Sequence, residues 1–287
     1  MKQGQPYDIA VIHLVWLPFG IDLFKEFIDS YLIYPAGYPH KLIIAFNGLK
    51  AQHPNNPGEY IDYIKEKGIL NFECLYFESG QDISIYKQAA ATISNEYILF
   101  LNSYSKIRAG NWLYFYVQNY TNNVGLIGAT GSFSSYLAAI NRKTARDVSS
   151  RMSVIKKIQS IKYAIKLNTV YRKWFSKFPN PHVRTTAFFI KRTIFNDIEM
   201  VDPKNKLQAY FFENGVNSIT RQVLNKKLEC VLIDKYGNCY KISEWPESKT
   251  FWQAGQENLL IADNQTEKYD LADIKIRRLL SCEAWGK

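Results

Sequence analysis

The sequence predicts an α/β fold with an open, mostly parallel, doubly wound sheet flanked by helices. Two observations support this prediction. Strand-like and helix-like runs alternate over residues 7–102, which is the pattern of parallel βαβ units. The chain also has 287 residues, of which 47% are hydrophobic and 22% charged, so it can bury a substantial core.

The first half of the chain contains the alternating elements. Residues 7–17 form a β-branched, nearly continuous apolar run that predicts a buried strand, and Pro18 and Gly20 end it. Asp22 can cap the helix that follows over 21–32. Further strands are predicted at 41–48, 71–77, 96–102 and 123–131, with helices at 59–68, 83–94 and 111–120.

The ends of these strands are the first candidates for a binding site. Parallel strands joined by right-handed crossovers end at one edge of the sheet, and open α/β sheets bind their ligands there. The residues at this edge are Val15-Trp16, Asn47-Gly48 and Asn102-Ser103. No GxGxxG or P-loop motif follows a strand, which argues against NAD-dependent enzymes and P-loop nucleotide hydrolases.

The second half predicts a strand at 185–191, a helix at 211–227 and a strand at 228–234. A C-terminal extension rich in aromatic and amide side chains follows. Its residues Trp245, Trp252, Gln256 and Asn264 suit either an acceptor or lid surface, or a cover over one edge of the sheet.

Most of the net charge of +10 lies in one segment. No Asp or Glu occurs from Val148 to Asn196, and eight basic residues lie between Ser150 and Phe178. Apolar residues spaced three and four apart predict amphipathic helices within 148–180. Three interpretations of 150–178 remain open: contact with a membrane or lipid acceptor, packing on the core with solvated lysines, or nucleic-acid binding. The absence of zinc-finger, basic-heptad and RNP-like patterns argues against nucleic acid.

The cysteines and the N-terminus predict a cytoplasmic protein. The four cysteines form no CxxC pair, and no His stands at a zinc-ligand spacing from them, so a reducing compartment fits best. The first residues lack the features of a secretory signal, and no window approaches 18 uninterrupted apolar residues. A peripheral position on the inner face of a membrane depends on the basic segment.

Several segments, taken in order, resemble the GT-A fold of family 2-type glycosyltransferases, in particular a bacterial surface-polysaccharide subgroup. They are ESGQDISIYKQAA, YILFLNSYSKI followed by GNWL, VGLIGATGS, NPHVRTTAFFIKR, FFENGVNSITRQVLNKKLECVLID and SKTFWQAGQENLLIADNQT. The resemblance covers nearly the whole chain. It implies transfer of a sugar from a UDP-, dTDP- or GDP-linked donor to a glycan or lipid-linked acceptor.

The resemblance also implies a single GT-A-like domain over 1–287. Residues 1–131 would form the nucleotide-sugar-binding half, and 148–180 the basic helical segment. Residues 181–287 would form the acceptor-binding half with the C-terminal extension.

The chain departs from this family where relatives carry an acidic DxD motif that holds Mg²⁺ or Mn²⁺. The matching residues here are Asn102, Ser103, Tyr104 and Ser105, which carry no charge. Divalent cations of this kind prefer anionic oxygen ligands, so we expect no metal site and no required cofactor. The diphosphate charge would then fall to cationic side chains, for which Arg184, Arg221, Lys191 and His182 are candidates.

By resemblance, the nucleotide-sugar donor contacts Trp16, Asn47 and Asp82, and also Asn102, Ser103, Ser105 and Arg221. Trp16 can stack on a base, while Asn47 and Asp82 can bond base or ribose edges. The alternatives are a core role for Trp16 and a simple turn at Asn47-Gly48.

The resemblance assigns the catalytic base to Glu213, at the start of the helix before the last strand. The alternative is a helix-terminal residue favoured by the helix dipole. His182, Arg184 and Trp252 are assigned to the acceptor or the diphosphate.

Two other functions stay open. A nucleotidyltransferase would need a Gly-rich, basic phosphate loop after the first strand, and WLPFGID lacks one. A non-catalytic relative that binds glycans or nucleotide sugars would also lack the DxD acids.

Overall fold

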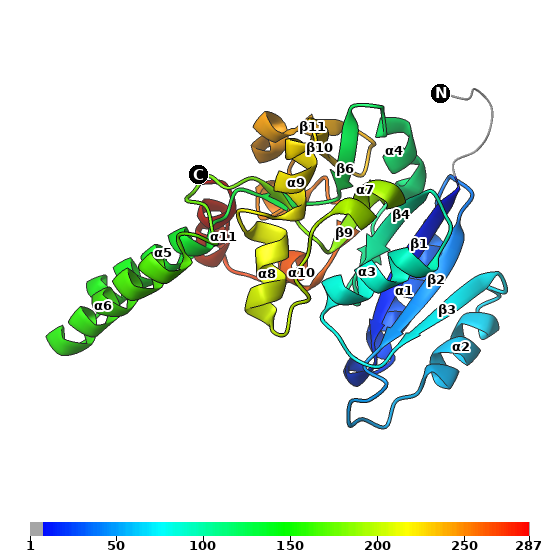
Figure 1. The fold of residues 1–287 in the computed structure, drawn as a ribbon, viewed down its shortest axis with the longest axis horizontal. Helices are drawn as coiled ribbons and strands as arrows, with labels where there is room; N and C mark the ends of the chain where they lie inside the picture. The colour runs from blue at the N-terminus through cyan, green and yellow to red at the C-terminus, as the bar shows by residue number, and fades with distance from the viewer. Residues whose placement is uncertain (1–7, 287) are drawn as a thin grey trace.

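A computed structural model describes residues 8–286, and its central sheet has eight strands in the order β11-β10-β6-β9-β4-β1-β2-β3 (Figure 1). β1 pairs in parallel with β2 and β4, β2 with β3, and β6 with β10. β9 and β11 are antiparallel to their neighbours. The predicted open, mostly parallel sheet is therefore confirmed. The strand bounds are β1 Ile9–Trp16, β2 Lys41–Asn47, β3 Phe72–Phe77, β4 Tyr97–Leu101, β6 Val124–Gly128, β9 Ala187–Lys191, β10 Glu229–Ile233 and β11 Cys239–Lys241.

Helices cover both faces of this sheet. Alternate residues of β1 enter opposite cores, because side chains of a strand point to opposite faces in turn. Ile12 packs with α3 and α7, whereas Val11 packs with α1, α2 and α4. The helix bounds are α1 Asp22–Ile33, α2 Pro57–Glu66, α3 Asp82–Thr92, α4 Trp112–Asn119, α5 Tyr136–Ser149, α6 Val154–Tyr171, α7 Arg192–Asp197, α8 Lys206–Asn214, α9 Ile219–Asn225, α10 Asn264–Asp270 and α11 Ile274–Trp285.

Two short antiparallel ladders bring distant segments together. β5 (Lys106–Ile107) pairs with β12 (Ile261–Ala262), which ties the C-terminal extension to the segment after β4. β7 (Gly131–Ser132) pairs with β8 (His182–Val183). This ladder joins the residues just before α5 to those that follow α6.

The predicted helix at 211–227 is wrong, because the chain forms two helices there. Gly215 ends α8, and a Cβ on it would lie 2.4 Å from the Phe211 carbonyl oxygen. Ser218 then caps α9 by accepting from the Arg221 amide. Glu213 consequently lies at the C-terminal end of α8, where the helix dipole disfavours a carboxylate, so the dipole explanation of this residue is also wrong.

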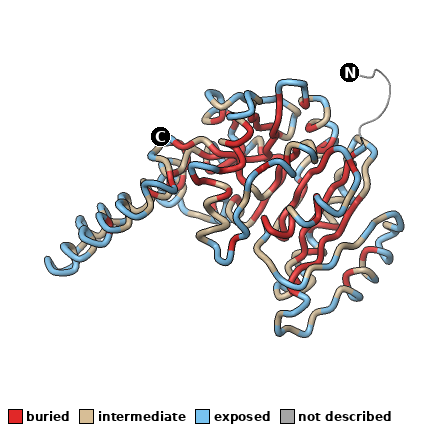
Figure 2. The backbone as a smooth tube through the Cα atoms, viewed as in Figure 1, coloured by how far each residue is buried: buried red, intermediate tan, exposed pale blue. Residues whose placement is uncertain are grey.

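Two antiparallel helices, α5 and α6, project from the body (Figure 1), and only α6 lies within the predicted basic segment 148–180. Helical structure starts at Tyr136, earlier than predicted, and ends at Tyr171. Most of α6 is exposed, including Val154 and Ile155 (Figure 2). Packing of this helix on the core is therefore ruled out as its explanation. Within residues 8–286, no helix is both long and apolar enough to cross a bilayer.

His13 is buried in the middle of β1 and has an unusual environment. Its ring stacks on Phe27, with centroids 3.7 Å apart, and neither ring nitrogen has a hydrogen-bond partner among the described residues. Burial lowers the pKa of His13 to about 3. The folded protein therefore keeps this ring neutral.

This burial predicts a pH-dependent loss of stability. An unfolded His has a pKa of about 6.5, so below that pH the unfolded chain binds a proton that the folded chain does not. This site should lower the free energy of unfolding by about 1.4 kcal/mol per pH unit from about pH 6.5 toward pH 3. Urea unfolding at several pH values should show a shallower pH slope for His13→Leu than for the unsubstituted protein. Equal slopes would contradict this reading.

Candidate active site

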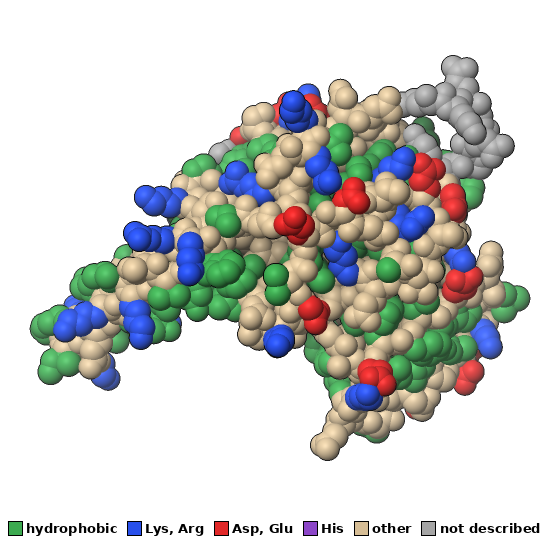
Figure 3. Space-filling view, viewed as in Figure 1, with side chains coloured by type: hydrophobic (Ala, Val, Ile, Leu, Met, Phe, Trp, Pro, Cys, Tyr) green, Lys and Arg blue, Asp and Glu red, His purple; other side chains and the backbone are tan. Residues whose placement is uncertain are grey.

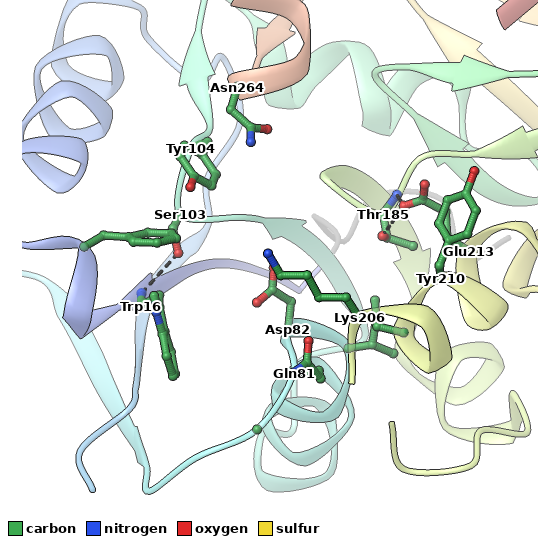
Figure 4. Close-up of a pocket in the computed structure, with 14 residues that line it drawn as sticks. Trp16, Gln81, Asp82, Ser103, Tyr104, Thr185, Lys206, Tyr210, Glu213 and Asn264 are labelled. Carbon is green, nitrogen blue, oxygen red and sulfur yellow. Dashed lines mark hydrogen bonds between the residues drawn. The ribbon is translucent and has the colours of Figure 1, made fainter. Parts of the chain in front are cut away.

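A pocket of about 460 Å³ lies at the carboxyl ends of β1 and β4. The first turns of α3 and α8 and the segment before β9 complete its walls (Figure 4). Its lining residues are Trp16, Phe19, Gly80, Gln81, Asp82, Ile83, Ser103, Tyr104, Thr185, Lys206, Ala209, Tyr210, Glu213 and Asn264. Four of the residues predicted to contact the donor or to act as the base meet here: Trp16, Asp82, Ser103 and Glu213.

Trp16 is held by the neighbouring strand ends. Its amide donates to the Ser103 Oγ over 3.1 Å, which joins the ends of β1 and β4. Gly48 lies against the indole, since a Cβ there would be 2.9 Å from the ring, and its φ of +94° also favours glycine. The ring is only partly buried and lines the pocket, so a purely internal role for Trp16 is wrong.

Asn47, Asn102 and Ser105 support the pocket from behind and do not line it. Asn47 Nδ2 donates to the Gly80 carbonyl over 2.9 Å and so holds the loop before α3. Asn102 Oδ1 accepts from the Tyr104 amide and from Ser105 Oγ, at 3.1 and 3.0 Å. The predicted ligand contacts of these three buried residues are therefore corrected to positioning contacts.

Asp82 and Lys206 extend into the same part of the pocket from the first turns of α3 and α8 (Figure 4). The Asp82 carboxyl is accessible from the pocket, yet the surrounding protein replaces much of its water. This desolvation raises the pKa of Asp82, against the opposing effect of the Lys206 charge. Sequence reasoning missed Lys206 because it assigned this region to a loop and began the helix at residue 211.

Glu213 is half-buried and fixed by Thr185. Its Oε2 accepts from the Thr185 amide at 2.9 Å and from the Thr185 Oγ1 at 2.5 Å (Figure 4). Thr185 was also missed by sequence reasoning, because this pair joins residues far apart in the chain. The contact leaves the carboxylate at the wall of the pocket.

A second pocket of about 180 Å³ shares Tyr210 and Glu213 with the first. It contains all three residues that the sequence assigned to the acceptor or diphosphate: His182, Arg184 and Trp252. Its other lining residues are Ser132, Ser134, Phe251, Gln265 and Glu283. Glu213 thus lines both pockets.

Arg184 is a paired and buried charge. Its guanidinium lies 2.8 Å from the Asp263 carboxylate and 4.2 Å from the centre of the Phe251 ring. The approach to Asp263 Oδ2 lacks hydrogen-bond geometry, so the attraction is mainly between charges. Asp263 also caps α10 by accepting from the Gln265 and Thr266 amides.

The other predicted cations do not reach the first pocket. Burial lowers the pKa of His182, which favours its neutral form, and His182 Nδ1 contacts the Asn180 carbonyl at 2.9 Å. Arg221 donates to Asn180 Oδ1 at 3.2 Å. Lys191 pairs with Glu96 beside the first residue of β4, at the opposite edge of the sheet, because β9 is antiparallel. The assignment of Lys191 to the diphosphate is therefore wrong.

The C-terminal extension has mixed roles. Trp245 is fully buried in the core, and the buried Gln256 donates to the Thr266 carbonyl and to Asp270. Trp252 stacks on Phe251 at the second pocket, and Asn264 lines the first.

The first pocket holds few acidic side chains. Within residues 8–286, no group of three or more His, Cys, Asp or Glu side chains could hold a metal ion. The first pocket has two carboxylates, Asp82 and Glu213, and Thr185 already binds the second. The turn at 102–105 adds only neutral side chains.

No protein-family model matches the chain, and no curated protein matches it in sequence. Solved glycosyltransferases show distant similarity in structure. A mannosyltransferase from Pyrobaculum calidifontis, solved with GDP-Man and Mn²⁺, is 11% identical with a TM-score of 0.40, covering 67% of this chain and 48% of its own. Glucosyl-3-phosphoglycerate synthase from Mycobacterium tuberculosis, solved with Mn²⁺, UDP and glucosyl-3-phosphoglycerate, is 12% identical with a TM-score of 0.38, covering 68% and 61%.

TarS residues 1–349 from S. aureus are 12% identical with a TM-score of 0.39, covering 76% of this chain and 56% of that one. The chain thus spans about half to three fifths of the length of these structures. Similarity at this level does not identify an activity, which has to be argued from the site.

The Arg184–Asp263 pair predicts a large stability effect. Asp263→Asn keeps a capping side chain for α10 but leaves the buried Arg184 charge without a counter-charge. We expect a loss of about 3–5 kcal/mol in the free energy of unfolding. Adding Arg184→Met should recover part of that loss, because the unpaired charge is removed. Chemical unfolding of both variants measures this, and an Asp263→Asn variant as stable as the unsubstituted protein would contradict it.

Proposed function

We propose that this protein is a glycosyltransferase that moves a sugar from a nucleotide diphosphate donor to a hydroxyl group of a glycan or lipid-linked acceptor. One observation carries the proposal: Glu213 lines both pockets. The larger pocket lies at the carboxyl ends of parallel strands, where open α/β sheets bind their ligands. A transferase needs a base between the sugar donor and the acceptor hydroxyl.

The larger pocket takes the donor in this proposal. Trp16 offers an indole face for the base, and Asp82 offers a carboxylate for base or ribose edges. Lys206 is the basic side chain among the described lining residues and would pair with the diphosphate of a UDP-, dTDP- or GDP-linked sugar. The first turns of α3 and α8 add the partial positive charge of helix N-termini.

The smaller pocket takes the acceptor. Glu213 accepts the proton of the acceptor hydroxyl, whose oxygen forms a bond to the anomeric carbon. The bond between that carbon and the diphosphate oxygen breaks, and its electron pair leaves with the diphosphate. Attack from the side opposite the leaving group inverts the anomeric configuration, and one carboxylate is enough for this chemistry. Thr185 orients Glu213 through its two hydrogen bonds.

No divalent metal is needed in this proposal. The diphosphate charge is balanced by Lys206 and by the helix N-termini, which act as fixed positive groups around the leaving group. Arg184 contributes to the shape of the acceptor pocket, since Asp263 already balances its charge.

The first test is Glu213→Gln, which keeps the size of the side chain and removes the base. Transfer should fall by about 10²–10⁴-fold while the fold is retained. The matched control is Glu257→Gln at an exposed carboxylate that pairs with Lys249, and it should stay active. Product formation from a panel of nucleotide sugars measures the effect. A fully active Glu213→Gln variant would show that another residue is the base. Binding of nucleotide sugars without any transfer by the unsubstituted protein would identify it as a non-catalytic relative.

The second test concerns Lys206. Lys206→Gln should weaken the binding of the cognate nucleotide diphosphate by about tenfold or more, because one charge-assisted hydrogen bond is lost. Lys204→Gln removes an exposed lysine two positions away, outside the pocket, and serves as the control. Thermal-shift titrations with UDP, GDP, dTDP and CMP identify the nucleotide, since ligand binding raises stability by mass action. Equal affinities for the two variants would contradict this role.

A further inference from the structure

The α5–α6 hairpin and the segment after it, residues 136–178, concentrate positive charge, and we call this region the basic hairpin. It contains eleven Lys and Arg residues and one acid, Asp147. It therefore carries the entire formal net charge of +10, and the rest of the chain is balanced. Figure 3 shows basic and hydrophobic side chains together along this projection.

One side of α6 presents an apolar stripe to solvent. Val154, Ile158, Ile161 and Ile165 recur at helical spacing and are between 41% and 71% exposed. A different side faces α5, where Ala164 is buried and where Ser160 and Asn168 bond to Asp147 and Asn141. The stripe is thus left uncovered by the hairpin itself. Lys157 and Lys162 flank it along the helix.

An apolar groove lies at the base of the hairpin. It has a volume of about 360 Å³ and is walled by Trp174 and Phe211, whose rings stack with centroids 5.5 Å apart. Val201 and Val216 at the groove are exposed, and Lys173 stands at its edge. Exposed apolar side chains thus occur both along α6 and at the base of the hairpin, where one lysine, Lys173, and one acid, Glu199, line the groove.

We propose that the basic hairpin and this groove bind the surface of an anionic lipid bilayer. The apolar stripe would enter the interface between headgroups and acyl chains, while the lysines contact lipid phosphates. The charge argues for this partner. Two copies of the chain that met at this surface would repel each other, because each carries a net charge of +10 there. Binding to nucleic acid would explain the lysines but not the row of exposed isoleucines.

The hairpin base adjoins the second pocket. Tyr136 of α5 lies 6.1 Å, between ring centroids, from Tyr210, and Arg142 lies 3.8 Å from Glu283. The Val216 amide, just after α8, donates to the Trp174 carbonyl at 2.9 Å. A bilayer bound here would thus lie beside the pocket that receives the acceptor. This last point rests on the proposed function and favours a lipid-linked acceptor, whereas bilayer binding stands without it.

Co-sedimentation with vesicles tests the proposal on the full chain. One set of vesicles contains phosphatidylcholine alone, and the other phosphatidylcholine with phosphatidylglycerol. We expect binding to the anionic set that weakens with salt. The double variant Lys162→Gln/Lys166→Gln should reduce this binding by about 30-fold, because each lysine near an anionic surface contributes about fivefold. The double variant Ile158→Gln/Ile165→Gln should reduce it by at least about tenfold.

Matched controls change exposed residues on the body. Ile33→Gln/Leu70→Gln and Lys65→Gln/Lys227→Gln remove the same side-chain types away from the hairpin and should bind as the unsubstituted protein does. Circular dichroism checks that all variants keep their helices. Glu213→Gln should bind vesicles as the unsubstituted protein does. A protein that binds anionic vesicles but transfers no sugar would therefore contradict the proposed function and leave the bilayer proposal intact.

Three results would overturn the proposal. The first is equal vesicle binding by the hairpin and control variants. The second is a dimer that the isoleucine variant dissociates, with no vesicle binding, which would assign the stripe to a second copy. The third is steeply salt-dependent binding to duplex DNA or RNA that needs the lysines and not the isoleucines, again without vesicle binding.

Discussion

The hydrogen bonds from Thr185 to Glu213 join the parts of the molecule on which the site depends. Thr185 lies just before β9, which runs antiparallel between β4 and β6. Because β9 runs against its neighbours, its beginning, and not its end, reaches the edge where β1 and β4 stop. That reversal brings residues 182–185 to the candidate site, and α8 then places Glu213 at both pockets.

The charges around this carboxylate are few and mostly paired. Asp263 balances Arg184, and burial favours neutral His182. This leaves Lys206 facing Asp82 in the larger pocket, together with two helix N-termini. In the proposed function, the helix N-termini supply fixed positive dipoles to the diphosphate, and the exposed Lys206 side chain adds a positive charge. In the proposed function, these groups take the place of the metal that acidic motifs hold in other enzymes.

Local sequence patterns predicted the strand ends, and with them Trp16 and Ser103 at the pocket, whereas Asp82 and Glu213 came from the family resemblance. The alternation of apolar residues could not predict the direction of β9, because this pattern is the same for parallel and antiparallel strands. The prediction that Lys191 lies near the diphosphate therefore failed. Lys206 and Thr185 depend on a helix start and a long-range contact that no local pattern specifies. The spacing of α6 likewise predicted an amphipathic helix, but only the structure shows its apolar stripe uncovered.

The central claim is that Glu213 acts as the single base beside a diphosphate that no metal neutralises. The most direct test is the anomeric configuration of the product, followed by proton NMR during transfer in excess EDTA. Our account predicts that product forms at an undiminished rate and with inverted configuration. Transfer that stops in EDTA and returns with Mn²⁺, or a product with retained configuration, would contradict it.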